Sequence, residues 1–211
     1  MKEIGIFGGS FNPPHKGHIN LIENFLREKA LDYLIVIPAG IPPHKELKSN
    51  VSREQRMKMC ELTFKDIKPK EKIILSSYEL EREGKSYTVR TLKALKEYFS
   101  KEFSEVPEFN FLIGDDMLFY FHKWYKPEEI LKLTKITVGV REKENSISDL
   151  KNYAKTYFKK EYENNRFEFL KMDAFPVSST EIREKIHNGE DVSEYLTEKN
   201  YEYIKKEGLY V

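Results

Sequence analysis

Short runs of apolar, β-branched and aromatic residues alternate along this chain with longer segments whose apolar residues recur every three or four positions. The short runs predict strands at residues 4–7, 33–37, 73–76, 109–113, 136–140 and 167–172. The longer segments predict helices at residues 17–29, 53–67, 89–103 and 148–162. Strands that alternate with helices are typical of a parallel sheet. We therefore expect an α/β fold, a Rossmann-like doubly wound parallel sheet of five to six strands with helices on both faces.

Two more helices are predicted near the end of the sequence. Ser178 and Glu181 match the S-x-x-E capping box, which predicts a helix that begins there and ends before Gly189. Residues 201–210 read as a last helix with Gly208 as its stop. A chain of 211 residues fits a single domain over residues 1–211. We expect its C-terminal helical part, about 179–211, to pack on the sheet.

Composition narrows the classes of partner. The chain has 36 basic and 35 acidic residues and a formal net charge of +1, which gives no overall field for nucleic acid or a membrane surface. No apolar run approaches the length of a membrane span. The first predicted strand leaves no room for a signal peptide, so we expect a cytoplasmic protein. A single Cys60 excludes an intramolecular disulfide and a cysteine-based metal site.

A glycine-rich turn with two histidines follows the first predicted strand and has the sequence GGSFNPPHKGH over residues 8–18. Backbone N–H groups of such a turn, the positive end of the next helix and two imidazoles can all bind one anion. The turn lacks the last glycine of G-x-G-x-x-G and the G-K-[ST] ending of a P-loop. A tight turn with two surface histidines is the alternative. We predict a polyphosphate site that includes Gly8, Gly9, Ser10, Phe11, His15 and His18.

A second anion site is predicted at the start of the helix that Ser178 caps. Its N-terminal amides, the hydroxyls of Ser179 and Thr180, and Arg183 one turn later would together bind an anion. An ordinary, well-capped helix would explain the same residues if they stood alone. Taken alone, these residues favour the ordinary helix, and the choice of the phosphate site depends on the family resemblance given below.

Other polar residues also follow predicted strands, where ligands of parallel sheets bind. A proline-rich loop ends in His44 and Lys45, which suit a phosphate, although an exposed lysine after a plain connection is equally consistent. Thr88 opens a helix and is also explained as a helix cap. Gly114 and Asp116 follow the strand at residues 109–113.

An aromatic pair and an arginine complete the candidate site. Trp124 and Tyr125 stand beside Lys123 in a loop, where they could stack on a flat aromatic ligand, although a lone tryptophan is more often part of the core. Arg141 comes at the end of a predicted strand and suits a carboxylate or phosphate, with a surface ion pair as the alternative.

The histidine turn resembles the T/H-x-G-H signature of the nucleotidylyltransferase superfamily, and VSSTEIR at residues 177–183 resembles its I-S-S-T-x-I-R element. Five further segments are similar, in the same order, to segments of the bacterial nicotinate-nucleotide adenylyltransferases. They are PPHK, SYTV, GDD, KWY and VGVR. This resemblance spans residues 4–183. Arg90 and Asp115 depart from it, since the family usually has an aspartate and a small residue there.

The resemblance implies roles for the candidate residues. His15, His18 and Arg183 would be catalytic and would bind the ATP phosphates together with Ser179 and Thr180. Gly8, Gly9, Ser10, Phe11, Gly114 and Asp116 would complete the ATP site. His44, Lys45, Thr88, Trp124, Tyr125 and Arg141 would bind nicotinate mononucleotide.

The implied activity is transfer of AMP from ATP to nicotinate mononucleotide in NAD biosynthesis. Mg2+ would be the cofactor and would arrive on the ATP phosphates, with no protein metal site. Nicotinamide mononucleotide and phosphopantetheine are alternative acceptors, and a non-catalytic nucleotide-binding domain is a further alternative. The sequence leaves open whether the chain forms a homo-oligomer.

Overall fold

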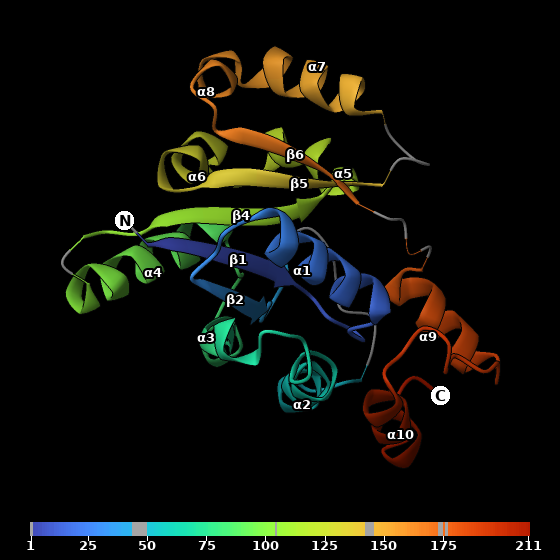
Figure 1. The fold of residues 1–211 in the computed structure, drawn as a ribbon. Coiled ribbons are helices and arrows are strands. Elements are labelled where there is room, and N and C mark those ends of the chain that lie inside the picture. Colours follow the sequence, from blue (N-terminus) through green and yellow to red (C-terminus); the bar gives the residue numbers. More distant parts are fainter. Residues whose placement is uncertain (1, 44–49, 104, 142–145, 173–174, 176) are drawn as a thin grey trace.

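The sheet of this protein is parallel throughout its described pairings. The computed structural model describes residues 2–43, 50–103, 105–141, 146–172, 175 and 177–211, the side chain of Arg141 excepted. The strands are β1 (Glu3–Gly9), β2 (Tyr33–Pro38), β3 (Ile73–Leu75), β4 (Glu108–Gly114), β5 (Lys135–Arg141) and β6 (Phe167–Met172). They form one six-stranded sheet in the order β3-β2-β1-β4-β5-β6 (Figure 1). The predicted doubly wound sheet is confirmed.

The helices follow the strands in the predicted alternation, with short additions. They are α1 (Lys16–Glu28), α2 (Arg53–Phe64), α3 (Tyr78–Glu81), α4 (Thr88–Glu102), α5 (Asp115–Leu118), α6 (Pro127–Leu133), α7 (Ile147–Tyr157), α8 (Lys159–Glu163), α9 (Ser179–His187) and α10 (Glu198–Lys206). Two 3-10 turns, η1 (Lys70–Lys72) and η2 (Phe121–Lys123), complete the described elements.

Three helix predictions need correction. The helix expected at residues 148–162 is two helices, because Phe158 leaves the helical region at φ −140° and ψ 48°. The sequence analysis missed α6, which begins with Pro127 after Lys126 in the left-handed region. The last helix starts earlier than expected because the Thr197 side chain accepts a hydrogen bond from the Asn200 N–H and so caps it.

Both faces of the sheet are covered, which is why its strands are almost continuously apolar. Ile4 and Ile6 of β1 belong to a core cluster with residues of α4, α6 and α7. Phe7 belongs to a second cluster with residues of α1 and α2. Successive strand residues point to opposite faces, so these clusters lie on the two sides of the sheet. Figure 1 shows α1 in front of β1.

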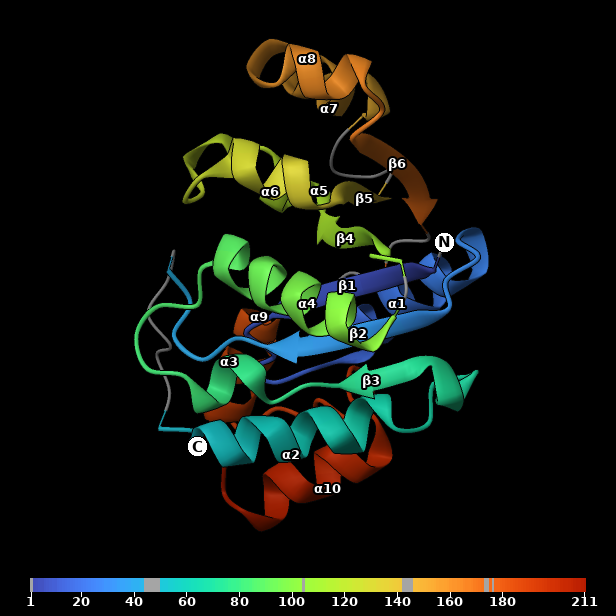
Figure 2. The same ribbon diagram turned by 90° about the vertical axis from the view of Figure 1, so that its left-hand side faces the viewer.

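The C-terminal helices were expected to pack on the sheet, but their core contacts lie elsewhere. Ile182, Val192, Leu196, Ile204 and Leu209 form a third cluster with Met59 of α2, and no strand residue is among the described members. Figure 2 shows α10 side by side with α2. This part of the chain is therefore anchored on a helix that itself covers the sheet.

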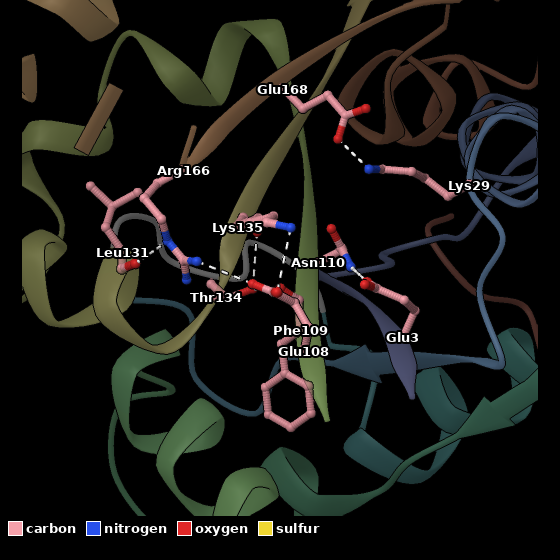
Figure 3. A network of polar contacts seen from close by, with 10 residues as sticks. All are labelled: Glu3, Lys29, Glu108, Phe109, Asn110, Leu131, Thr134, Lys135, Arg166 and Glu168. Atoms are coloured by element: carbon pink, nitrogen blue, oxygen red, sulfur yellow. Dashed lines mark hydrogen bonds and ion pairs between the residues drawn. The ribbon is translucent and has the colours of Figure 1, made fainter. Parts of the chain in front are cut away.

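A network of polar contacts ties the amino ends of the strands together (Figure 3). Glu108 of β4 forms ion pairs with Lys135 and Arg166, at 3.4 and 3.1 Å. The buried Thr134 hydroxyl bonds the carbonyl oxygen of Phe109 at 2.8 Å. In a parallel sheet these amino ends lie at the opposite edge from the carboxyl ends, where ligands bind. We assign this network to stability.

Candidate functional site

The topology of the sheet places the glycine-rich turn where parallel sheets bind ligands. The strand order reverses between β1 and β4, which are neighbours. Gly8 and Gly9 end β1, and Gly114 ends β4. A crevice forms outside the carboxyl ends at such a reversal. The predicted residues of both strand ends therefore meet at one edge of the sheet.

His15 and His18 lie together at the start of α1. His15 is the N-cap, and the two imidazole centroids are 3.7 Å apart. The backbone N–H of His15 donates to Nδ1 of His18 at 3.2 Å, so the neutral tautomer that accepts this bond carries its proton on Nε2. A Cβ on Gly17 would lie 2.9 Å from Nδ1 of His15. The close packing of the ring leaves no room for any residue but glycine at position 17.

Burial controls the charge of His15. Its side chain is buried, and loss of solvation lowers its pKa from 6.5 to about 4, while Glu181 opposes the shift. His15 is therefore neutral at pH 7 in the protein without ligand, and it can donate one hydrogen bond to an anion. The predicted two-histidine cradle thus does not carry two imidazolium charges.

The segment that precedes α1 accepts hydrogen bonds from three side chains in the C-terminal part of the chain. Arg183 Nη1 donates to the Asn12 carbonyl at 2.7 Å, and the Ser179 hydroxyl donates to the Pro13 carbonyl at 2.9 Å. The Asn200 amide donates to the Pro14 carbonyl at 3.0 Å. The start of α9 therefore lies against the segment that carries His15, as the two predicted anion sites required.

These contacts change the expected chemistry of α9. The Ser179 hydroxyl was expected to be free for phosphate, but it is bonded to Pro13. Arg183 also bonds the Ser179 carbonyl and, through Nη2 at 3.1 Å, the Thr180 hydroxyl. Arg183 is thus held one turn into the helix in a fixed orientation. Its contacts bring the two predicted anion sites together.

Tyr210 lies beside the candidate site, although the sequence analysis assigned it only to a helix end. Its hydroxyl donates to Oδ1 of Asn12 at 2.7 Å and lies 3.7 Å from Sδ of Met59. Burial raises the pKa of this phenol, so it stays protonated and able to donate. A helix-end pattern could not reveal this bond, because it joins residues 198 positions apart.

Phe11 enters the site differently from the prediction. Its side chain is fully buried, and its ring meets the His18 ring edge to face at 5.0 Å. The residue as a whole is 0% exposed, so Phe11 supports the histidine ring and presents no surface to a nucleotide. At the end of β4, Asp116 is exposed whereas its neighbour Asp115 is completely buried and accepts a bond from the Asp116 N–H.

The segments expected to bind the acceptor base also converge. Tyr125 is 44 % exposed, and its ring lies 4.7 Å from that of Tyr87, the residue before Thr88. Trp124 is half-buried and packs on Phe111 and Phe121. One aromatic wall is thus made from the end of η2 and the start of α4.

Three acceptor residues predicted from the sequence are only partly open to test. His44 and Lys45 lie outside the described residues, and only the backbone of Arg141 is described, at the end of β5.

A cavity of about 320 Å³ lies between β6 and the helices α7 and α8. Its described lining contains none of the predicted site residues.

Two further findings concern the described part of the chain as a whole. It contains no group of three or more histidine, cysteine or acidic side chains placed to hold a metal ion. None of its helices combines the length and the apolar character needed to cross a membrane.

Comparison with known proteins gives a matching family model and full-length relatives. The cytidylyltransferase-like family model matches residues 6–185. The probable nicotinate-nucleotide adenylyltransferase of Clostridium acetobutylicum is 38% identical over 211 residues and all of both chains. The nicotinate-nucleotide adenylyltransferase of Bacillus subtilis is 33% identical over 210 residues, covering 100% of this chain and 99% of that one.

A solved structure shares the fold. The nicotinic acid mononucleotide adenylyltransferase of Plasmodium falciparum complexed with NaAD superposes with a TM-score of 0.77 at 20% identity, over 100% of this chain and 98% of that chain. The resemblance seen in the sequence is thus confirmed by full-length relatives and by the architecture. The chain belongs to the nicotinate-nucleotide adenylyltransferase family, within the cytidylyltransferase-like proteins.

Proposed function

We propose that this chain transfers AMP from ATP to nicotinate mononucleotide, forming nicotinate adenine dinucleotide and pyrophosphate in NAD biosynthesis. The observation that carries the proposal is the contact between the histidine turn and the start of α9, through Arg183 and Ser179. Two helix N-termini beside one glycine-rich turn suit a triphosphate, which needs many donors. Full-length relatives with this activity in their names support the choice of acceptor.

The reaction needs positioning more than it needs a protein nucleophile. An acceptor phosphate oxygen attacks the α-phosphorus of ATP, a new P–O bond forms, and the bond to pyrophosphate breaks on the opposite side. Both phosphate groups are already good nucleophile and leaving group, so alignment and stabilisation of charge account for catalysis. No proton has to be removed from the acceptor.

In this proposal His18 and Arg183 donate to the ATP phosphates, and the neutral His15 donates one further bond. The backbone of Gly8, Gly9 and Ser10 at the end of β1 would also face the phosphates, and the buried ring of Phe11 would hold His18 in place. Thr180 and the first amides of α9 supply the second side. Gly114 ends β4 and Asp116 follows it, and both would face the ribose and adenine of ATP.

The acceptor would bind between the aromatic wall and the proline-rich loop. Thr88, Trp124 and Tyr125 would surround the nicotinate ring, and Arg141 would favour its carboxylate. His44 and Lys45 would approach the acceptor phosphate. Buried donors discriminate strongly between an acid and an amide, because the wrong group leaves them unpaired.

ATP would enter with a divalent cation, which we propose to be Mg2+, held largely by phosphate oxygens and water. The cation supplies charge neutralisation on the phosphates and is part of the substrate. The proposal treats residues 1–211 as one functional domain and places it in the cytoplasm, where ATP is available.

The test is a pyrophosphate-release assay with ATP and Mg2+ against nicotinate mononucleotide, nicotinamide mononucleotide and phosphopantetheine in parallel. We expect the highest kcat/KM with nicotinate mononucleotide. A higher value with either other acceptor would reassign the substrate. Absence of pyrophosphate release with all three would favour a binding domain without catalysis.

A further inference from the structure

A fully buried arginine connects the two loops that the proposed reaction must bring together. Arg56 of α2 is 1% exposed. Its Nη1 donates to the carbonyl of Ser10 at 3.1 Å and to that of Ala39, and its Nη2 donates to the carbonyl of Gly40 at 3.0 Å. Ser10 follows β1 on the ATP side, whereas Ala39 and Gly40 follow β2 and lead to the acceptor loop.

The loop after β2 is also fixed from its other side. The Gly40 N–H donates to the Ser86 hydroxyl at 2.9 Å. A Cβ on Gly40 would lie 2.2 Å from the carbonyl oxygen of Glu79, so only glycine fits there. Glu79 is itself held by the Thr91 hydroxyl. The backbone of Gly40 is thus bound at both its N–H and its C=O. The two loops also meet directly, because the Ala39 N–H donates to the Gly9 carbonyl at 2.8 Å, and Arg56 adds a side-chain link between them.

Arg56 is unusual because its charged guanidinium is buried against uncharged carbonyl groups. Arginine is almost never fully buried without a charged partner. No carboxylate forms an ion pair with Arg56 among the residues that the structure describes, and its described bonds go to carbonyl oxygens. Burial lowers the pKa of the guanidinium, but arginine stays protonated in proteins. The planar fork of donors is what lets one side chain reach two loops at once.

We propose that Arg56 is a positioning residue for adenylyl transfer. It fixes the loop after β1, which contains Ser10 and which we call the ATP loop, relative to the loop after β2, which contains Gly40 and which we call the acceptor loop. The inference rests on the proposed function, which places ATP beside the loop after β1 and the acceptor beside the loop after β2. In-line attack requires the two phosphates to be aligned closely, and a misplacement of about 1 Å can cost about 100-fold in rate. Arg56 acts through Ser10 and Gly40 and touches neither substrate.

The deciding variant is Arg56→Lys. Lysine keeps the charge but offers a single nitrogen, which cannot serve both loops with the geometry of a guanidinium. We expect kcat to fall by about 10- to 100-fold. Binding of ATP alone and of nicotinate mononucleotide alone, measured by calorimetry without turnover, is expected to stay close to wild type. A merely structural role would not separate kcat from the two binding constants.

Arg53→Lys is the matched control. Arg53 lies one turn earlier on the same helix and also donates to carbonyl oxygens, those of Leu80 and Arg82, at 2.9 and 3.3 Å. It bonds neither loop in the described structure. We expect its kcat to match wild type. Arg56→Gln, which also removes the charge, serves as a second variant, and thermal unfolding verifies that each protein is folded.

A wild-type kcat for Arg56→Lys would overturn the inference. So would a loss of binding for one substrate that equals the loss of kcat, because Arg56 would then support only one half of the site. Failure of the proposed function looks different, since the wild-type protein itself would release no pyrophosphate with nicotinate mononucleotide.

Discussion

His18 is the residue whose chemistry the structure defines most closely. The His15 N–H occupies its Nδ1, which leaves Nε2 as the donor nitrogen. We expect His18→Ala to lower kcat by about 10²- to 10³-fold, the usual effect of removing one donor to developing negative charge. Steady-state kinetics would measure this effect, and an unchanged melting temperature would show that the fold is intact. Near-normal turnover would remove His18 from the mechanism.

His15 makes the stability of the protein depend on pH. Its pKa is about 4 in the folded chain and 6.5 in the unfolded one, so the unfolded chain binds more protons between these values. Stability therefore falls as pH falls from 6.5 to 4. Between pH 7 and pH 4.5 the wild type should lose about 2.5 kcal/mol more of its unfolding free energy than His15→Asn. Urea unfolding at the two pH values checks this, and equal losses would contradict it.

At this scale the sequence indicates which residues can bind an anion, but not which contacts their side chains make. Residue types in the turn and at the start of α9 indicated anion binding, and these two segments do meet. The bonds of Ser179 to Pro13 and of Tyr210 to Asn12 could not be predicted. They join positions far apart in the chain, and no local pattern records which carbonyl a hydroxyl will reach.

Among the elements, we assign the amino ends of the strands to the stability of the fold and place no substrate there. Thr134 is completely buried, and its hydroxyl donates to the strand carbonyls there. Thr134→Val keeps the shape and removes the donor, so we expect a loss of about 1–2 kcal/mol in unfolding free energy. We expect kcat to be unchanged. A fall in kcat would show that the two edges of the sheet are coupled.

The control for this change is Thr156→Val on α7. Thr156 is exposed, and its hydroxyl bonds the carbonyl of Asn152 within the same helix. The unfolding free energy of the Thr156→Val variant is expected to stay within about 0.5 kcal/mol of wild type, as is usual for substitutions at the surface. Urea unfolding of both variants separates the loss of a buried bond from the loss of a hydroxyl.

The strands could be predicted because burial on both faces makes their sequences almost continuously apolar. Element ends were less certain. The break at Phe158 falls within an amphipathic pattern that continues into α8, so periodicity could not place it. Pro127 starts α6 directly after Lys126, whose backbone lies in the left-handed region. The sequence does not indicate this conformation, because lysine rarely adopts it.

At the level of the whole molecule, the C-terminal region holds the segment that precedes α1. Tyr210 lies partly buried beside the third core cluster and bonds Asn12. Tyr210→Phe removes only this hydroxyl, so we expect a stability loss of about 1 kcal/mol. Because Asn12 begins the segment that carries His15, we also expect kcat to fall by about tenfold. Steady-state kinetics and urea unfolding measure the two effects.

Tyr203→Phe is the matched change in the same cluster, since Tyr203 packs there without a described hydroxyl bond. Its kcat is expected to equal that of wild type. Equal kcat values for the two tyrosine variants would show that Tyr210 contributes packing alone. The packing of this region on α2 was not predicted, because a capped amphipathic helix shows which face is buried but not what covers it.

The bonds from residues 183, 200 and 210 to the segment at residues 12–14 also bear on synthesis in the cell. During translation the glycine-rich turn leaves the ribosome first, and the side chains that hold it follow 171 to 198 residues later. The histidines are therefore present long before their pocket can form. Nucleotide capture should begin only once residue 210 has emerged, and a nascent chain stalled before α10 should bind ATP weakly.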